Sequence, residues 1–210
     1  MKLKKIASLM LAGVMAVSML AGCSGKTEEK PGDENTNVAP VTGAAAIVNS
    51  ELNANKDKIS FTDDSVIANV VANYFKENPV KPGEWNNAAS GSATTTTWYS
   101  DLRDTINSMV GAKGQMTKGF ASNGSNEGTY ANMYVLSTKF LTKEDALRMV
   151  AKDLDGLDLP KEGKVGSGVT VANKDFSYTG TISAVEAESK GGTESVWVIV
   201  ATMTQTSADK

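Results

Sequence analysis

Carboxylates, lysines and hydroxyl groups are the side chains through which this chain could do chemistry. The sequence has no histidine, and only Arg103 and Arg148 are arginine. Without histidine, Ser-His-Asp and Cys-His catalysis and imidazole metal ligands are excluded. The single cysteine, Cys23, excludes an internal disulfide, a Cys-rich zinc site and an iron–sulfur cluster. Two arginines argue against a phosphate or nucleic-acid site built from guanidinium groups. We expect no cofactor and no nucleic-acid partner.

The densest group of carboxylates lies at residues 153–158, where Asp153, Asp155 and Asp158 surround Gly156. Spaced aspartates around a glycine can supply oxygen ligands to Ca²⁺. However, a calcium loop counted from Asp153 would require glutamate at its twelfth position, which is occupied by Lys164. An exposed helix end closed by the glycine explains the same residues. We therefore predict no metal site here.

Exposed aromatic side chains could stack on sugar rings. Trp85 lies in a stretch rich in proline, glycine and asparagine, and it is the ligand-binding candidate that the sequence offers. Trp98 and Trp197 instead fall on apolar faces of a predicted helix and a predicted strand, where large aromatic side chains usually form core. A nucleophilic serine needs an activating base, and no S-x-x-K pair stands in a convincing position. No catalytic residue is predicted.

Three segments have apolar residues at the spacing of an amphipathic helix, at residues 64–78, 98–110 and 142–155. Pro79 ends the first, and Gly111 and Gly156 close the other two. Residues 44–58 add a further, weaker helical pattern. These helices must pack on whatever sheet the rest of the domain supplies.

The C-terminal third has the pattern of a β-hairpin. Phe176–Glu188 and Ser195–Thr206 are rich in β-branched and aromatic residues, with a glycine-containing turn between them. The second strand is apolar on both faces, so we expect it to be central. Residues 130–140 fit a strand or a helix, and residues 165–172 fit a short strand.

Helices followed by strands predict an α+β fold, with an antiparallel sheet of about three to five strands and helices packed on one face. The order of a helix followed by a hairpin over residues 142–206 resembles small extracytoplasmic modules of the PepSY kind, in the order of elements alone.

The first 23 residues have the features of an export signal. Three lysines precede an apolar run over residues 6–21, which is shorter than the roughly 20 residues needed to span a bilayer. The run ends in Leu20-Ala21-Gly22-Cys23, which resembles the lipobox of bacterial lipoproteins. In that family the cysteine carries a diacylglyceryl group and the signal is cut just before it. The resemblance implies that residues 1–22 are a signal peptide and that Cys23 is the lipid attachment site, on the extracytoplasmic face of the cell membrane.

Residues 23–45 are polar and interrupted by prolines, a composition typical of a flexible tether. Residues 46–210 then form a single globular α+β domain. The whole chain carries a net charge of −3, and loss of the signal removes only positive charge, which favours a well-solvated surface domain.

We expect a noncatalytic binding or interaction module at the cell envelope, with a protein or glycan partner. The alternative is a carboxylate-based hydrolase of wall or glycan material, which requires two carboxylates facing one cleft, about 5–10 Å apart. A third reading, a structural or assembly factor, predicts a large exposed apolar patch.

Overall fold

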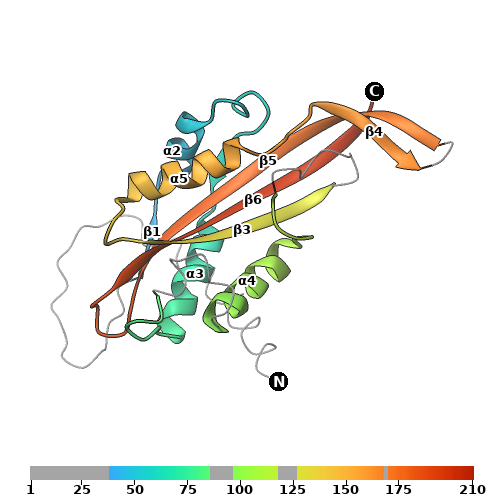
Figure 1. The fold of residues 1–210 in the computed structure, drawn as a ribbon. Helices are drawn as coiled ribbons and strands as arrows, with labels where there is room; N and C mark the ends of the chain where they lie inside the picture. The colour runs from blue at the N-terminus through green and yellow to red at the C-terminus, as the bar shows by residue number, and fades with distance from the viewer. Residues whose placement is uncertain (1–37, 86–96, 118–126, 168–169) are drawn as a thin grey trace, which may run out of the picture. The chain divides into compact units, whose positions relative to one another are not determined.

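A six-stranded sheet with four helices forms the domain in the computed structural model, which describes residues 38–85, 97–117, 127–167 and 170–210 (Figure 1). The described residues belong to one compact unit. In chain order the elements are β1 (Val38–Val41), α2 (Ala44–Glu51), β2 (Phe61–Asp63), α3 (Ser65–Glu77), α4 (Thr97–Val110), β3 (Gly128–Ser137), α5 (Lys143–Asp155), β4 (Glu162–Ser167), β5 (Thr170–Glu188) and β6 (Ser195–Asp209).

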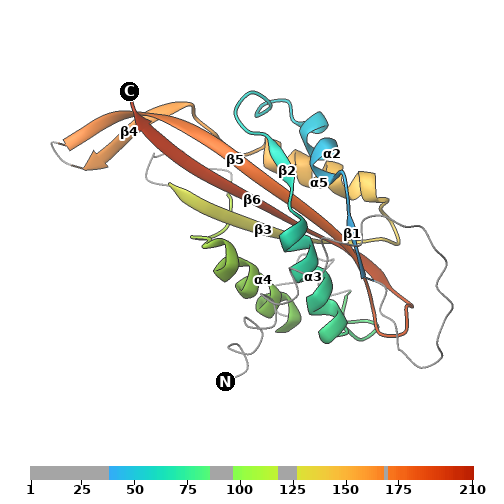
Figure 2. The same ribbon diagram turned by 180° about the vertical axis from the view of Figure 1, so that it is seen from behind.

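The longest strand, β5, organises the sheet. On one side it pairs antiparallel with β6 over the whole C-terminal hairpin, and β3 pairs antiparallel with the other side of β6. On its opposite side β5 pairs in turn with β4, β2 and β1, each at a different segment (Figure 2). Of these three, β2 is parallel to β5 and the other two are antiparallel. The predicted central position of β6 is confirmed.

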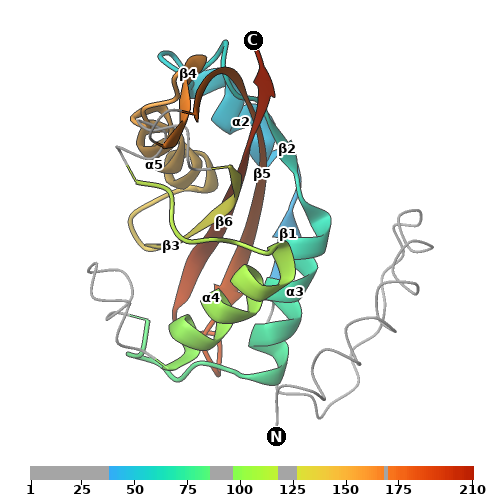
Figure 3. The ribbon, with the colours of Figure 1, turned by 90° about the vertical axis from the view of Figure 1, so that its right-hand side faces the viewer.

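Helices cover both faces of this sheet. Side chains of one parity in β5 and β6, among them Ile182 and Ile199, pack with α2 and α5, whereas those of the other parity, among them Val185 and Val198, pack with α3 and α4. Figure 1 shows the two helix pairs on opposite sides of the strands, and Figure 3 shows α3 and α4 side by side. Each face therefore has its own hydrophobic core.

The predicted α+β class and the C-terminal hairpin are confirmed, and two details differ. The sheet has six strands instead of three to five, and the helices lie on both faces instead of one. The physical reason for the second difference is that β6 is buried and apolar on both faces, so that neither face can be left in water.

The helices predicted at residues 64–78, 98–110 and 142–155 are each found within one residue of their expected bounds. The Asp64 side chain accepts a hydrogen bond from the backbone N–H of Ile67 at the start of α3, and Thr142 accepts one from Asp145 at the start of α5, as helix caps do. The fourth helix, α2, ends at Glu51 instead of continuing to residue 58.

Residues 128–137 form a strand, β3, which decides between the two readings of residues 130–140. The single short strand expected at residues 165–172 is replaced by the end of β4 and the start of β5.

The domain begins earlier than expected, because residues 38–41 form β1 and α2 starts with the fully buried Ala44. The last part of the predicted tether, from residue 38 to residue 45, thus belongs to the domain, since it pairs with β5 and contributes Ala44 and Ala45 to the core.

A close approach explains one glycine in the sheet. The Phe61 ring of β2 lies directly over Gly180 of β5, and a Cβ atom at that position would overlap the ring. Phe61 is itself buried, so the ring has no room to move away. Glycine is thus required at the position of β5 that pairs with Phe61 of the parallel strand β2.

Candidate functional site

An open concavity of about 460 Å³ lies between the end of α2 and α5. It is lined by five polar side chains, four of them charged: Glu51, Asn53, Arg148, Lys152 and Asp155. Arg148 and Lys152 stand four residues apart on α5, so the two cations share one face of that helix. We call this hollow the α2–α5 concavity.

Asp155 holds one wall of the α2–α5 concavity in place. Its Oδ1 atom accepts hydrogen bonds from the backbone N–H groups of Asn53 (3.0 Å) and Asn55 (2.9 Å). Burial by itself would raise the pKa of the Asp155 carboxyl, but the N–H groups of residues 53–55 and the Lys58 cation together hold that pKa below its ordinary value. The carboxylate is therefore ionised at neutral pH and serves the loop after α2.

Asn55 fixes the same loop from inside. Its side chain is completely buried, and Nδ2 donates to the backbone carbonyls of Leu154 (3.2 Å), Asp155 (3.0 Å) and Leu157 (2.9 Å). Leu154 and Asp155 are the last two residues of α5 and Leu157 follows the helix. Carbonyls at a helix end lack some of their helical partners. The loop that Asn55 holds thus occupies residues 52–58, where a continuation of the helix was predicted. Nothing local in the sequence marks Asn55, because its partners lie about a hundred residues away.

The cations of the α2–α5 concavity differ in what they contact. Arg148 Nε lies 3.1 Å from Glu51 Oε1, and a guanidinium NH₂ nitrogen lies 3.6 Å from Asp145 Oδ1. Lys152 forms no ion pair with any residue that the structure describes. Exposed ion pairs contribute little and exchange readily. Lys152 is therefore the charge in this hollow that is most available to a ligand, and Arg148 could exchange Glu51 for one.

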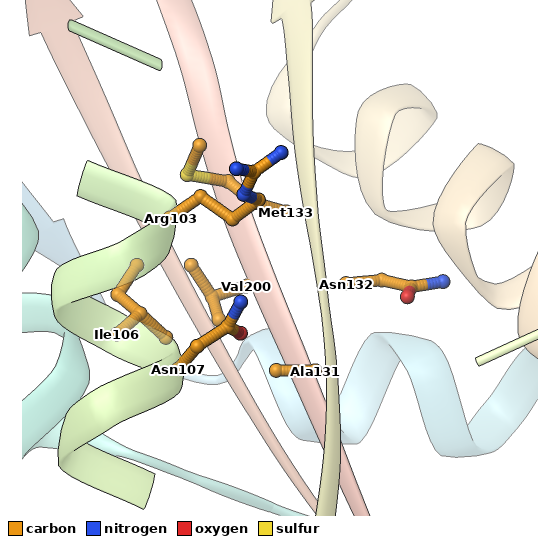
Figure 4. A pocket seen from close by; sticks show the side chains of 7 residues that line it. All are labelled: Arg103, Ile106, Asn107, Ala131, Asn132, Met133 and Val200. Atoms are coloured by element: carbon orange, nitrogen blue, oxygen red, sulfur yellow. The ribbon is translucent and has the colours of Figure 1, made fainter. Parts of the chain in front are cut away.

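A second hollow, on the opposite face of the sheet, is a narrow crevice between α4 and β3 (Figure 4). Arg103, Ile106 and Asn107 of α4 stand over β3, and the crevice does not admit a water molecule. The Arg103 guanidinium is engaged by the neighbouring Asp104 at 2.9 Å. In Figure 4 the Asn132 side chain points away from α4, and it bonds instead to the backbone of Met116. This crevice is packing space and offers no room for a ligand.

The exposed position expected of Trp85 is not found. Its side chain is 2% exposed, and its ring lies 5.4 Å from the Phe75 ring and 5.2 Å from the Trp98 ring, measured between centroids. The residues around it are polar in sequence, yet the indole fills the core between α3 and α4. Trp85 is thus a core residue, with no face free to stack on a sugar. The expected core position of Trp98 is confirmed, and Trp197 is partly buried and packs against the core.

The aspartates of residues 153–158 do not converge. Asp153 Oδ2 accepts a hydrogen bond from the Tyr134 hydroxyl at 2.6 Å, whereas Asp155 binds the loop after α2. Burial, followed by the bond to Asp153, raises the pKa of Tyr134 far above its ordinary value. Within the described ranges no group of three or more acidic or cysteine side chains could hold a metal ion.

The adjacent pair Asp63 and Asp64 is divided between two helices. Asp63 accepts hydrogen bonds from the backbone N–H groups of Gly43 (2.9 Å) and Ala45 (2.7 Å) at the start of α2. Asp64 caps α3. The pair is therefore structural, with one carboxylate for each helix start.

The predicted signal peptide and Cys23 lie outside the described residues. Among the helices that are described, none combines the length and the apolar character needed to cross a membrane. No protein-family model matches the chain, and neither the curated proteins nor the solved structures include a significant match to it.

Proposed function

We propose that the protein is a lipid-anchored, noncatalytic binding module of the cell envelope, and that the α2–α5 concavity is its ligand-binding surface. The observation that carries this proposal is the open hollow in which Lys152 has no described ion-pair partner and Arg148 holds only exposed ones. Leu20-Ala21-Gly22-Cys23 supports the lipid anchor.

The chemistry of the hollow favours a ligand with a negatively charged group. Two cations on successive turns of α5 can share one carboxylate or phosphate, and charged hydrogen bonds of this kind are stronger than neutral ones. The anions of the hollow are already used, Glu51 by Arg148 and Asp155 by backbone N–H groups. A bound anion would therefore be attracted by Arg148 and Lys152, while the two carboxylates of the hollow already have hydrogen-bond or ion-pair partners.

Catalysis by carboxylates is the second candidate, because Glu51 and Asp155 line the same hollow. A general acid needs a raised pKa so that it still carries a proton at neutral pH. The pKa of Asp155 is shifted in the opposite direction. Binding is thus the better supported function. Release of soluble fragments from purified peptidoglycan, abolished by Glu51→Gln, would reverse this preference.

Binding can be tested by co-sedimentation of the purified protein with peptidoglycan, whose stem peptides carry carboxylates. We expect Lys152→Ala to weaken binding about fivefold, which corresponds to about 1 kcal/mol for one charged contact. Lys143→Ala is the matched control, since Lys143 lies on the same helix but outside the concavity. Equal binding by the two variants would contradict a ligand site at this position.

The anchor has its own test. Cys23→Ser should release the protein from the membrane fraction, or leave it unprocessed with its signal attached, because the thiol that would carry the lipid is lost. Metabolic labelling with a fatty acid should mark the wild-type protein and not the variant. A wild-type protein that is fully soluble would contradict the lipid attachment.

A further inference from the structure

The described domain begins at a particular end of the sheet. The first residue of β1, Val38, pairs with Ala187, and the last residue of β3, Ser137, pairs with Val196. Ala187 and Val196 flank the turn that joins β5 to β6. The entry of the chain into the domain, the β5–β6 turn and the loop after β3 therefore lie at one end, which we call the entry end.

The entry end carries the most exposed large apolar side chain of the described residues. Phe140 is 77% exposed, compared with 41–51% for Val66, Met109 and Met149. The neighbouring Leu141 is held in place, because its carbonyl accepts a hydrogen bond from the Trp197 indole N–H at 3.1 Å. The backbone at this position is thus fixed while the Phe140 ring projects into solvent.

Positive charge accompanies this ring. Lys139 Nζ lies 5.4 Å from the centroid of the Phe140 ring, and Lys143 begins α5 three residues further on. Lys143 Nζ lies 3.8 Å from Glu144 Oε1 in a solvent-exposed ion pair, which exchanges readily. An aromatic ring flanked by lysines is the combination that favours the boundary between lipid headgroups and acyl chains, because the ring is buried while the ammonium groups stay with the headgroups.

The length of chain outside the domain brings this end close to the proposed anchor. Cys23 and Val38 are separated by a short polar segment, which as a coil would span about 20 Å. Val38 and Ser137 lie across four neighbouring strands, β1, β5, β6 and β3, which corresponds to about 14 Å. Phe140 is therefore within reach of the bilayer whenever the entry end turns towards it.

We propose that the entry end is a membrane-contact surface, in which Phe140 enters the lipid interface and Lys139 and Lys143 lie among the headgroups. The inference rests on the proposed lipid attachment at Cys23. Its consequence is an orientation. The α5 helix, 13 residues and about 20 Å long, starts at the entry end and carries Lys152 and Asp155 near its other end. The α2–α5 concavity is thus displaced along this helix from the membrane.

Tryptophan fluorescence tests the contact with the processed, lipidated protein. Phe140→Trp is reconstituted into vesicles of phosphatidylcholine and phosphatidylglycerol, 3:1, whose acyl chains are brominated. We expect the emission of the introduced indole, taken as the difference from the wild type, to fall about twofold or more relative to unbrominated vesicles. Met149→Trp is the matched control, at a side chain 51% exposed on α5, and it should lose less than about a tenth of its added emission.

The outcomes separate this inference from the proposed function. Equal quenching in the two variants, while the protein remains bound to the vesicles, would overturn the membrane contact and leave the anchor intact. A protein that does not bind vesicles even when wild type would refute the anchor. A third outcome is that the brominated lipids do not quench the indole at position 140 in vesicles that contain no other protein, whereas native membranes shield it from aqueous iodide. That result would overturn the lipid contact in favour of a protein partner.

Discussion

Replacement of Asn55 by alanine should be among the most damaging single changes outside the apolar cores. The substitution removes the Nδ2 donor from the carbonyls of Leu154 and Leu157, where the bond is buried, and from that of Asp155, where it is part-buried. The Leu154 carbonyl keeps a bond from the Leu157 N–H at 3.3 Å. A buried polar group without its partner costs about 1–3 kcal/mol. Because two Nδ2 protons are shared among three carbonyls, we expect a loss of about 3 kcal/mol in the free energy of unfolding.

Urea unfolding, followed by tryptophan fluorescence, measures this loss. With a denaturant slope of about 2 kcal/mol per molar, the midpoint of Asn55→Ala should fall by about 1.5 M. The matched control is Asn53→Ala, whose exposed side chain donates only to the nearby Glu51 carbonyl and which should cost no more than about 0.5 kcal/mol. Similar midpoints for the two variants would refute the account of Asn55 as the donor that holds the end of α5.

A carboxylate at the same position gives an independent check of sign. Asn55→Asp would place a negative charge against three carbonyl oxygens, so its folded pKa should lie above its unfolded pKa. At low pH the protonated carboxyl can donate a hydrogen bond and so contributes to the free energy of unfolding. This contribution is lost as the pH rises through the folded pKa. We expect the midpoint of this variant to approach that of the wild type on acidification, and a pH-independent difference would argue against the geometry.

Two further predictions concern the sheet and the loop after α2. Gly180→Ala should lower the melting temperature by several degrees, because its Cβ overlaps the buried Phe61 ring, and the double variant with Phe61→Leu should recover part of this loss. The pKa of Asp155 is depressed in the folded state, so its contribution to stability is present above the ordinary carboxyl pKa and is lost as the pH falls through the folded value. Asp155→Asn should therefore flatten the acid limb of the plot of stability against pH, and an unchanged acid limb would contradict the assigned shift.

Patterns within single elements predicted the helices and the hairpin well. The stripes of α3, α4 and α5 are local, and so are the capping residues Asp64 and Thr142. The alternation of Val196 and its neighbours with Trp197 and Ile199 already showed that β6 has two apolar faces. Two apolar faces require cover on both sides of the sheet, which a prediction of helices on one face does not provide.

Short strands and lone side chains were not predictable in this way. β1 and β2 have four and three residues, too few for a period, and they become strands only because β5 offers them an edge. Trp85 reads as a loop residue because its neighbours are polar, whereas its burial depends on Phe75 and Trp98. The α2–α5 concavity combines side chains from two helices far apart in sequence, so no spacing rule could have found it.

The pairing of β1 with β5 also constrains the order in which the molecule can be completed. The partner of β1 lies about 145 residues later in the sequence. The sheet is therefore complete only after a loop of nearly the whole domain has closed. A chain emerging from the ribosome cannot form this pairing until residues 184–187 have been made. We propose that this protein is exported, and late closure of the sheet is compatible with export. Until the C-terminal hairpin is available, β1 has no partner strand, so the N-terminal part of the domain cannot complete its fold before it passes through a membrane channel.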